Sequence, residues 1–177
     1  MKKRPLLLTA LGLAFSALGN AAVSPPLKFD FGSDRLAPGH TLVSPDTRYN
    51  PATGYGLISG EGLTVSSVPT APGRDALTSD ALVGAKPFSF VIDLPEGNYD
   101  VTVLLGDPAG AADTTVKAET RRLMLQSIKT PAGPTSVQAR TFTINIRTPA
   151  IAGGGRVSLK PREKDVFHWD DKLILEF

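Results

Sequence analysis

Hydrophobic and polar residues alternate along most of the chain in short runs. These runs are KFDF, LTVSSV, FSFVIDL, YDVTVLL, TFTINIR, RVSLK and LILEF. No long stretch shows the 3.6-residue apolar spacing that an amphipathic helix requires. A period of two places every second side chain on one face of a strand. The 17 glycines and 15 prolines fall mainly between the runs, where the chain must turn. The pattern predicts an all-β chain.

Many short strands separated by turn residues are typical of two packed antiparallel sheets rather than of a parallel α/β sheet. We therefore predict a jelly-roll-like antiparallel β-sandwich of about eight to ten strands, with the chain ends on neighbouring strands. The apolar positions of the alternating runs predict its core, which consists of Phe29, Phe31, Phe90, Ile92, Val101, Val103, Phe142, Ile144, Leu173 and Leu175.

The segment FVIDLPEGNYDVTVLLGD places two of these runs on either side of a turn. Pro95 fixes its own φ, and Gly97 and Asn98 can adopt the positive φ values of a tight reversal. We expect the flanking strands to pair antiparallel as a hairpin. The second strand ends at Gly106 and Asp107, which would place the Asp107 carboxylate at one rim of the sandwich.

The first residues have the three parts of a secretory signal peptide. Lys2, Lys3 and Arg4 form a basic start, an apolar segment follows, and small residues precede the expected cleavage site. The apolar run from residue 6 to 18 is about 13 residues long, shorter than the ~20 that span a bilayer. We therefore predict a signal peptide at residues 1–22, a single domain at residues 23–177 with no membrane anchor after cleavage, and a secreted or periplasmic location.

Removal of the leader changes the charge of the chain. The 19 basic residues fall to 16 against 17 acidic residues, so the net charge becomes −1. Nucleic-acid binding requires clustered Lys and Arg, and no such cluster remains. The chain has no cysteine and only two histidines, His40 and His168, which excludes thiolate catalysis and a multi-histidine metal centre.

The sequence offers little for catalysis. It has no G-x-S-x-G elbow, and neither histidine lies near a candidate serine nucleophile. Asp107 could pair with Asp170 and Asp171 for glycoside hydrolysis, but the sequence does not place these carboxylates at a catalytic separation. We expect no catalysis from these residues alone.

Several ordered segments carry a resemblance to a known family. They are KFDFGS, TRYNPATGYGL, FVIDLPEGNYDVTVLLGD, VKAETRRLML, ARTFTINIR and WDDKLILEF. Together they resemble the N-terminal domain of secreted bacterial rhamnogalacturonan acetylesterases, which are SGNH (GDSL-type) carbohydrate esterases. The resemblance covers about residues 28–177 and implies a malectin-like or galactose-binding-like β-sandwich.

The chain departs from that family in one respect. Its members continue into an esterase domain with a Gly-Asp-Ser block and a later Asp-x-x-His pair, and the Gly-Asp-Ser block is absent here. Gly106 and Asp107 are followed by Pro108 rather than serine. The resemblance therefore implies ester hydrolysis only for a full-length protein. The sequence leaves two alternatives open: the chain is a piece of a longer protein, or it is a free-standing sandwich.

Loops on a rigid sandwich are where sugar-binding groups usually lie, and sugars are held by aromatic faces and a few polar groups. The candidate ligand-binding residues are Tyr49, Tyr55, Asp107, Arg121, Arg122 and Trp169. Each also has a structural interpretation. Trp169 could cover the edge of the core, Asp107 could bond its own turn, and Arg121 could pair with Glu119 on one strand face.

A structural calcium ion is a further expectation, since galactose-binding-like sandwiches often carry one. Calcium takes six to eight oxygen ligands. Asp30 on the first strand could converge with Asp170 or Asp171 if the terminal strands pair. No other cofactor is expected.

Two functions follow from these features. The first is binding of a pectic, rhamnogalacturonan-type glycan through a loop rim. The second is a structural role, in which the rim docks on an SGNH esterase domain and shapes its cleft.

Overall fold

The computed structural model describes residues 4–8, 13–15, 26–33, 35–72, 74–133, 136–164 and 168–177. One sheet contains, in spatial order, β12 (Gln138–Ile146), β9 (Gly97–Leu105), β1 (Arg4–Leu8) and β2 (Leu13–Phe15). The other contains β11 (Arg122–Thr130), β10 (Ala112–Ala118), β13 (Lys172–Glu176), β8 (Ser89–Asp93) and β5 (Tyr55–Ser59).

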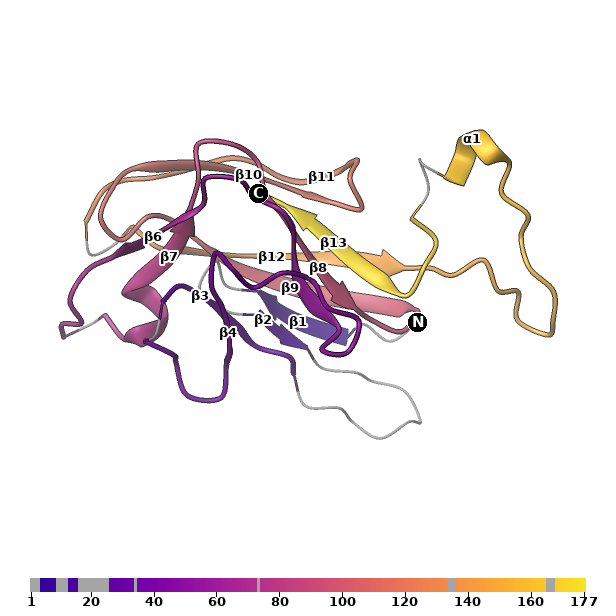
Figure 1. The fold of residues 1–177 in the computed structure, drawn as a ribbon, viewed down its shortest axis with the longest axis horizontal. Helices are drawn as coiled ribbons and strands as arrows, with labels where there is room; N and C mark the ends of the chain where they lie inside the picture. Colours follow the sequence, from indigo (N-terminus) through magenta and orange to yellow (C-terminus); the bar gives the residue numbers. More distant parts are fainter. Residues whose placement is uncertain are drawn as a thin grey trace.

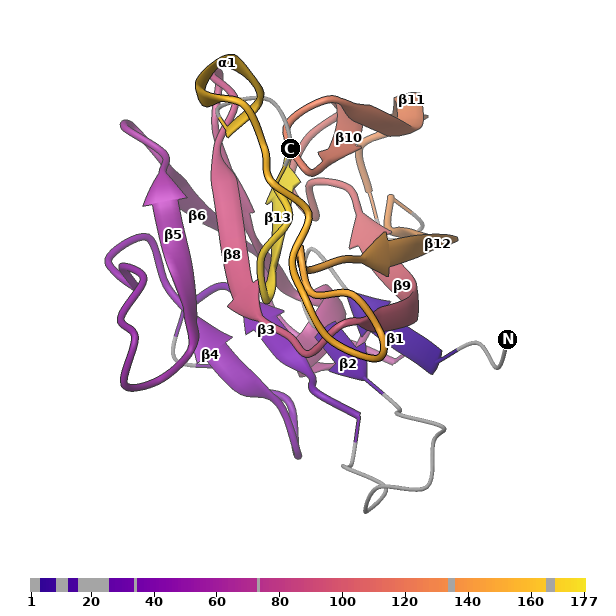
Figure 2. The ribbon, with the colours of Figure 1, turned by 90° about the vertical axis from the view of Figure 1, so that its right-hand side faces the viewer.

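Two smaller sheets and two short helices complete the regular structure of the described residues. The small sheets pair β3 (Phe29–Phe31) with β4 (Thr41–Val43) and β6 (Thr64–Ser67) with β7 (Asp80–Val83). The helices are η1 (Ala76–Thr78) and α1 (Pro161–Lys164). The main sheets face each other, and the segment that carries α1 extends from one end (Figures 1 and 2). The chain is an all-β sandwich, as predicted.

The core lies between the sheets, and all ten residues predicted for it are buried. Phe90 on β8 is fully buried, and its ring centroid lies 5.2 Å from that of Phe29 and 4.9 Å from that of Phe31. Period-two patterning was sufficient to find these positions, because each strand of a sandwich has one face turned to the opposite sheet.

The predicted hairpin between β8 and β9 is wrong. Strand β8 pairs with β13 and β5, whereas β9 pairs with β12 and β1, so the turn at Pro95 carries the chain from one sheet to the other. Gly97 and Asn98 have no positive φ and form the start of β9. The Tyr99 hydroxyl donates to the Pro95 carbonyl at 2.6 Å and fastens this crossing. The same turn residues fit a hairpin within one sheet and a crossing between two sheets. Which of the two forms depends on the strands that pair with β8 and β9, and these are distant in sequence.

Three further expectations differ from the structure. Residues 156–160 form no strand, and Val157 is exposed, because only an isolated bridge pairs residues 150 and 156. From residue 26 on, the described residues contain eleven strands rather than eight to ten. The terminal strands are not neighbours, since β3 pairs with β4 and β13 lies between β10 and β8.

Strands β1 and β2 lie within the predicted signal peptide. Strand β1 pairs parallel with β9 and antiparallel with β2, which forms the edge of the sheet. Residues 1–3, 9–12 and 16–22 of the predicted leader lie outside the described residues. The leader therefore stays a prediction.

Candidate functional site

The predicted binding residues lie at two opposite ends of the sandwich. Strand β13 runs from Lys172 to Glu176 along the five-stranded sheet, so its ends define a Lys172 end and a Phe177 end. Tyr49 contacts Lys172, and Trp169 precedes it by three residues. Asp107 lies at the other end, in a cleft shared with Glu176 and Phe177. The predicted residues therefore do not form one rim.

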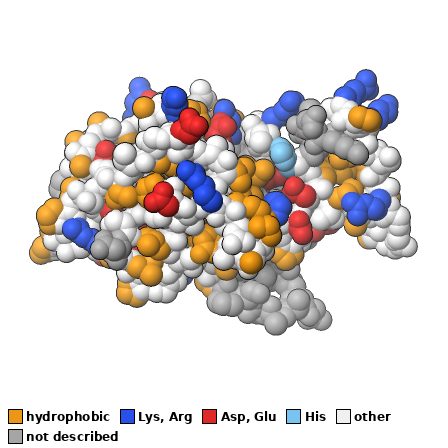
Figure 3. Space-filling view, in the orientation of Figure 1, with side chains coloured by type: hydrophobic (Ala, Val, Ile, Leu, Met, Phe, Trp, Pro, Cys, Tyr) orange, Lys and Arg blue, Asp and Glu red, His pale blue; other side chains and the backbone are white. Residues whose placement is uncertain are grey.

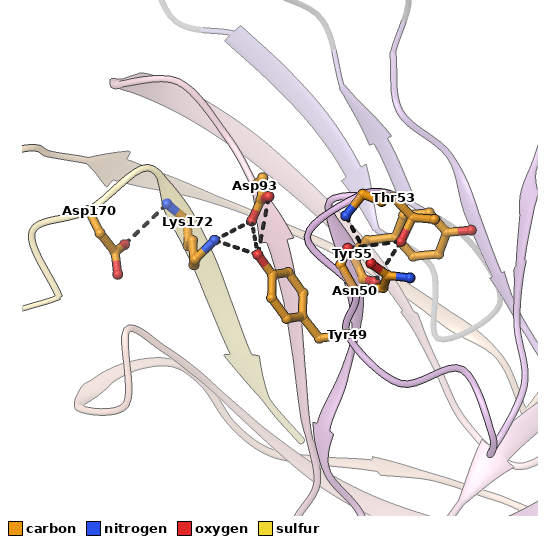
Figure 4. Close-up of polar contacts among 8 residues, drawn as sticks. Tyr49, Asn50, Thr53, Tyr55, Asp93, Asp170 and Lys172 are labelled. Carbon is orange, nitrogen blue, oxygen red and sulfur yellow. Dashed lines mark hydrogen bonds and ion pairs between the residues drawn. The ribbon is translucent and has the colours of Figure 1, made fainter.

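Tyr49, Asp93 and Lys172 form a polar network at the Lys172 end (Figure 4). The Lys172 ammonium donates to Asp93 Oδ1 at 2.6 Å and to the Tyr49 hydroxyl at 2.7 Å, and it lies 4.8 Å from the centroid of the Tyr49 ring. The Tyr49 hydroxyl donates to Asp93 Oδ1 at 3.0 Å. The hydrogen bonds to Asp93 and Tyr49 raise the pKa of Lys172. Tyr49 is thus occupied in fastening its loop to the sheet.

Tyr55 is not the loop aromatic that the sequence predicted. It is the first residue of β5, and its ring lies 4.9 Å from that of Phe29 and 6.5 Å from that of Phe90. The ring packs against the core, so it offers little surface to a sugar. The turn that precedes it is closed by Asn50, whose carbonyl accepts from the Thr53 N–H at 3.0 Å (Figure 4).

Arg121 and Arg122 lie at a tight turn rather than within one strand. Glu119 and Thr120 have φ values of 53° and 57°, and β11 begins only at Arg122. Arg122 Nη1 donates to the Asn145 carbonyl at 3.3 Å, across to the other sheet. The ion pairs of the described residues are Lys117–Glu176 and Lys172–Asp93, so the alternative pairing of Arg121 with Glu119 is wrong.

Glu119 is a buried acid that the sequence did not identify as unusual. Its Oε1 accepts from the Ile174 N–H at 3.1 Å. Burial raises the pKa of Glu119 to about 7, opposed by that hydrogen bond and reinforced by the charge of Asp170. His168 lies nearby, with its Nε2 3.2 Å from Thr120 Oγ1. The sequence carried no sign that Glu119 is buried, because the positive φ of this non-glycine residue is visible only in the structure.

A cleft of about 810 Å³ opens at the Phe177 end. Loop and strand residues from both main sheets and from the β6–β7 sheet line it. Asp107 reaches it because Gly106 turns the end of β9 with a φ of 141°. A Cβ at Gly106 would lie 2.5 Å from the Ser136 carbonyl oxygen, so only glycine fits there.

The Asp107 carboxylate both closes its own turn and faces the cleft. Its Oδ1 accepts from the Ala109 N–H at 2.8 Å and from the Ser66 hydroxyl. The structural interpretation of Asp107 is therefore correct for this oxygen. Oδ2 accepts no hydrogen bond from the described residues.

The cleft also contains aromatic and charged groups that the sequence did not point to. Phe88 and Phe177 exchange backbone hydrogen bonds of 3.1 and 2.9 Å, and their rings stack at 5.2 Å. Lys117 pairs with Glu176 at 2.7 Å, whereas the exposed Lys86 has no ion pair within the described part of the chain. Phe88 and Phe177 continue the period-two pattern of the core residues Phe90 and Leu175, which hid their part in the cleft.

The comparisons identify the family. A family model described as beta-agarase/YXIM esterase-like, galactose-binding domain-like matches residues 27–146, more than half of the 177-residue chain. This chain belongs to that family. The predicted likeness to a galactose-binding-like accessory domain of esterases is thus confirmed.

Two curated relatives of this galactose-binding-like domain are much longer. The uncharacterized esterase YxiM of Bacillus subtilis (strain 168) is 33% identical over 105 residues, which are 58% of this chain and 28% of YxiM. Beta-agarase A of Zobellia galactanivorans is 29% identical over 121 residues, 67% of this chain and 21% of the agarase. The crystal structure of B. subtilis YxiM matches with a TM-score of 0.47 at 28% identity, over 83% of this chain and 38% of that one.

The surface of the galactose-binding-like domain carries mixed charge. On the face in Figure 3, Lys and Arg side chains are spread out, with Asp and Glu side chains between several of them. None of the helices in the described part of the chain has the length and apolar character needed to cross a bilayer.

The three residues predicted for calcium lie in two places. Strand β3, which carries Asp30, does not pair with β13, so strand pairing does not bring Asp30 to Asp170 or Asp171. Asp170 Oδ1 accepts from the Lys172 N–H at 3.1 Å (Figure 4), and the Asp171 carbonyl accepts from the Leu94 N–H at 2.7 Å. Across the described ranges, no three His, Asp or Glu side chains are grouped as metal ligands.

Proposed function

We propose that this chain is the carbohydrate-binding accessory domain of a secreted or periplasmic carbohydrate-active enzyme, and that it binds pectic glycan of the rhamnogalacturonan type in the cleft at the Phe177 end. The single observation that carries the proposal is that cleft, which joins stacked aromatic rings to carboxylate and ammonium groups. Family membership and the names of the relatives, an esterase and an agarase, support the carbohydrate role.

Each part of the cleft has a role in this proposal. The rings of Phe88 and Phe177 offer an apolar face to a sugar ring. Asp107 Oδ2 accepts a hydrogen bond from a sugar hydroxyl. Lys86, which lines the cleft and is exposed, attracts the carboxylate of a galacturonate residue. Stacking would serve neutral and charged glycans alike, whereas Lys86 would favour the charged ones.

The affinity should be low, because a shallow site orders a flexible glycan while covering little surface. Binding in the millimolar to high-micromolar range corresponds to about 4 to 6 kcal/mol. The attraction between Lys86 and galacturonate is screened by salt over roughly 8 to 10 Å. Binding of charged pectic oligomers should therefore weaken with salt, and binding of neutral galactan should not.

Calorimetric titration tests the proposal. The unmodified chain and three variants are each titrated with a charged pectic oligomer and with neutral galactan. Phe177→Ala should lower affinity for both glycans, and Lys86→Ala should lower it for the charged oligomer only. Arg122→Ala is the control and should leave both affinities unchanged, because Arg122 does not line the cleft and its guanidinium donates to the Asn145 carbonyl. If Arg122→Ala removes binding while Phe177→Ala and Lys86→Ala do not, the cleft is not the site.

A second candidate is the docking role, and one observation favours it. Phe88 and Phe177 give the cleft an apolar patch of the kind that packs on another domain. The occupant of the cleft would then be an SGNH esterase domain rather than a glycan. The absence of any saturable signal at ten-millimolar sugar, together with an in-frame Gly-Asp-Ser block downstream in the gene, would favour docking over binding.

A further inference from the structure

A second hollow, of about 520 Å³, lies beside the cleft. It is lined by Arg48, Ile58, residues 59–61, Lys86 and Pro87, and we call it the side hollow. Its volume is within the range of ordinary small-ligand sites. Lys86 and Pro87 also line the cleft, so the two depressions share one wall.

Strand pairing at the Phe177 end explains why the side hollow adjoins the cleft. Ser59 of β5 pairs with Ser89 of β8, and Ser89 pairs with Glu176 of β13. Ser59 lines the side hollow and Glu176 lines the cleft. Their backbones are two strand spacings apart, which is about 10 Å. An oligosaccharide that lies in the cleft can therefore reach the side hollow by crossing the shared wall.

The backbone at Arg48 is fixed against the edge of β5. A parallel bridge joins Arg48 to Leu57, and the Tyr49 N–H donates to the Leu57 carbonyl at 3.1 Å. The Leu57 N–H donates to the Thr47 carbonyl at 2.8 Å. Gly56 permits this close approach, because a Cβ there would lie 2.5 Å from the Arg48 carbonyl carbon. The exposed Arg48 side chain therefore enters the side hollow from a fixed position.

The side hollow has a surplus of positive charge. Arg48 and Lys86 are both exposed, and neither forms an ion pair with any residue that the structure describes. Glu61 is the acid among the lining residues, so two positive charges accompany one negative charge. Ile58, which is 51% exposed, adds apolar surface. A guanidinium can donate two parallel hydrogen bonds to a carboxylate, so this combination suits an acidic sugar.

We propose that the side hollow is a second acidic-sugar subsite, in which Arg48 binds the galacturonate that follows, along the glycan, the one held at the cleft. This inference rests on the proposed glycan binding and specifies its ligand further, as one with at least two carboxylates. Rhamnogalacturonan carries a carboxylate on every second sugar. A disaccharide would therefore engage the cleft alone, whereas a tetrasaccharide would engage both depressions and gain from the linkage of two weak contacts.

Calorimetric titration of the full chain with rhamnogalacturonan oligomers of two and four sugars tests the proposal. At low salt the tetrasaccharide should bind about fivefold more tightly than the disaccharide, the effect of one added exposed charge pair. High salt should reduce this gain, because exposed charges are screened. The gain should disappear when the carboxyls of both oligomers are reduced to primary alcohols.

Variants locate the second contact. Arg48→Ala should remove the gain and leave the disaccharide affinity unchanged, whereas Arg48→Lys, which keeps the charge, should retain part of the gain. Glu61→Gln should increase the gain, because it removes a charge that repels the ligand. Arg162→Ala is the matched control and should keep the full gain, since Arg162 is an exposed arginine on α1 that lines neither depression.

The same titrations separate failure of this inference from failure of the proposed function. Equal affinities for the two oligomers, or a gain that survives Arg48→Ala, would overturn the second subsite and leave glycan binding in the cleft intact. The absence of a saturable signal with either oligomer would overturn the proposed function and this inference with it.

Discussion

Single residues determine where the backbone turns at the cleft and how the buried acid Glu119 titrates. Glycine is the only residue type that fits at position 106, the end of β9, and the turn that it makes there places Asp107 at the cleft. Glu119 shows the opposite case, in which a non-glycine residue with a positive φ is held by its own buried side chain. Both positions combine an unusual backbone conformation with close packing, so both are sensitive to substitution.

Gly106→Ala should destabilise the fold more than the same change at a glycine whose new Cβ would contact no other atom. At Gly106 the new Cβ would lie 2.5 Å from the Ser136 carbonyl oxygen, in addition to the cost of a φ of 141°. We expect a loss of about 2 to 3 kcal/mol in the free energy of unfolding. Gly154→Ala is the control, because its φ is 115° but no atom lies within 4 Å of the new Cβ. Equal losses in urea denaturation of both variants would contradict the steric explanation.

Glu119 should make stability depend on pH. Burial raises the folded-state pKa of Glu119 to about 7 from the ordinary value of 4.5, so between these values the folded chain binds more protons than the unfolded one. The free energy of unfolding should therefore fall as the pH rises from about 4.5 to 7 and level off above 7.

Glu119→Gln keeps an acceptor for the Ile174 N–H and removes the titration. In EDTA, its free energy of unfolding should fall less steeply between pH 4.5 and 7 than that of the unmodified chain. Glu61→Gln, in an exposed loop, controls for the exchange of a carboxyl for an amide. An unchanged slope in Glu119→Gln would show that Glu119 is ionised throughout this range.

At the scale of elements, the period-two pattern identified most of the central strands but not their partners. The predicted runs around β3, β6, β8, β9, β12 and β13 are strands, whereas 156–160 are not. Strands β10 and β11 were missed because polar residues such as Asp113, Lys117 and Lys129 interrupt their apolar pattern. Pairing could not be predicted, since the crossing at Pro95 and a hairpin use the same turn residues.

Tyr99→Phe tests how this crossing is fastened. The change removes the 2.6 Å hydrogen bond from the Tyr99 hydroxyl to the Pro95 carbonyl and keeps the buried ring. We expect a loss of about 1 kcal/mol in the free energy of unfolding, the usual net value of one hydrogen bond. Thermal and urea denaturation would measure it. A neutral result would mean that packing of the β8–β9 connection alone determines the crossing.

At the scale of the whole molecule, the core and the fold class followed from the sequence and the site did not. All ten predicted core residues are buried, because burial of one strand face is a local property of the pattern. The candidate site is not local. The sequence analysis assigned Tyr49 and Asp107 to one loop rim, yet they lie beside opposite ends of β13. Their separation follows from the order of the strands in the sheets, which the alternating pattern does not reveal.

The most direct test of the glycan-binding account is a titration followed by two-dimensional ¹H–¹⁵N NMR. Trp169 is the only tryptophan, so its indole N–H gives one assigned signal at the Lys172 end, far along β13 from the cleft. With a rhamnogalacturonan oligomer added to ten millimolar, the backbone signals of Lys86, Asp107 and Lys117 should shift and saturate while the indole signal stays in place. A saturating shift of the Trp169 indole with unmoved cleft signals would contradict the account and place binding at the Lys172 end.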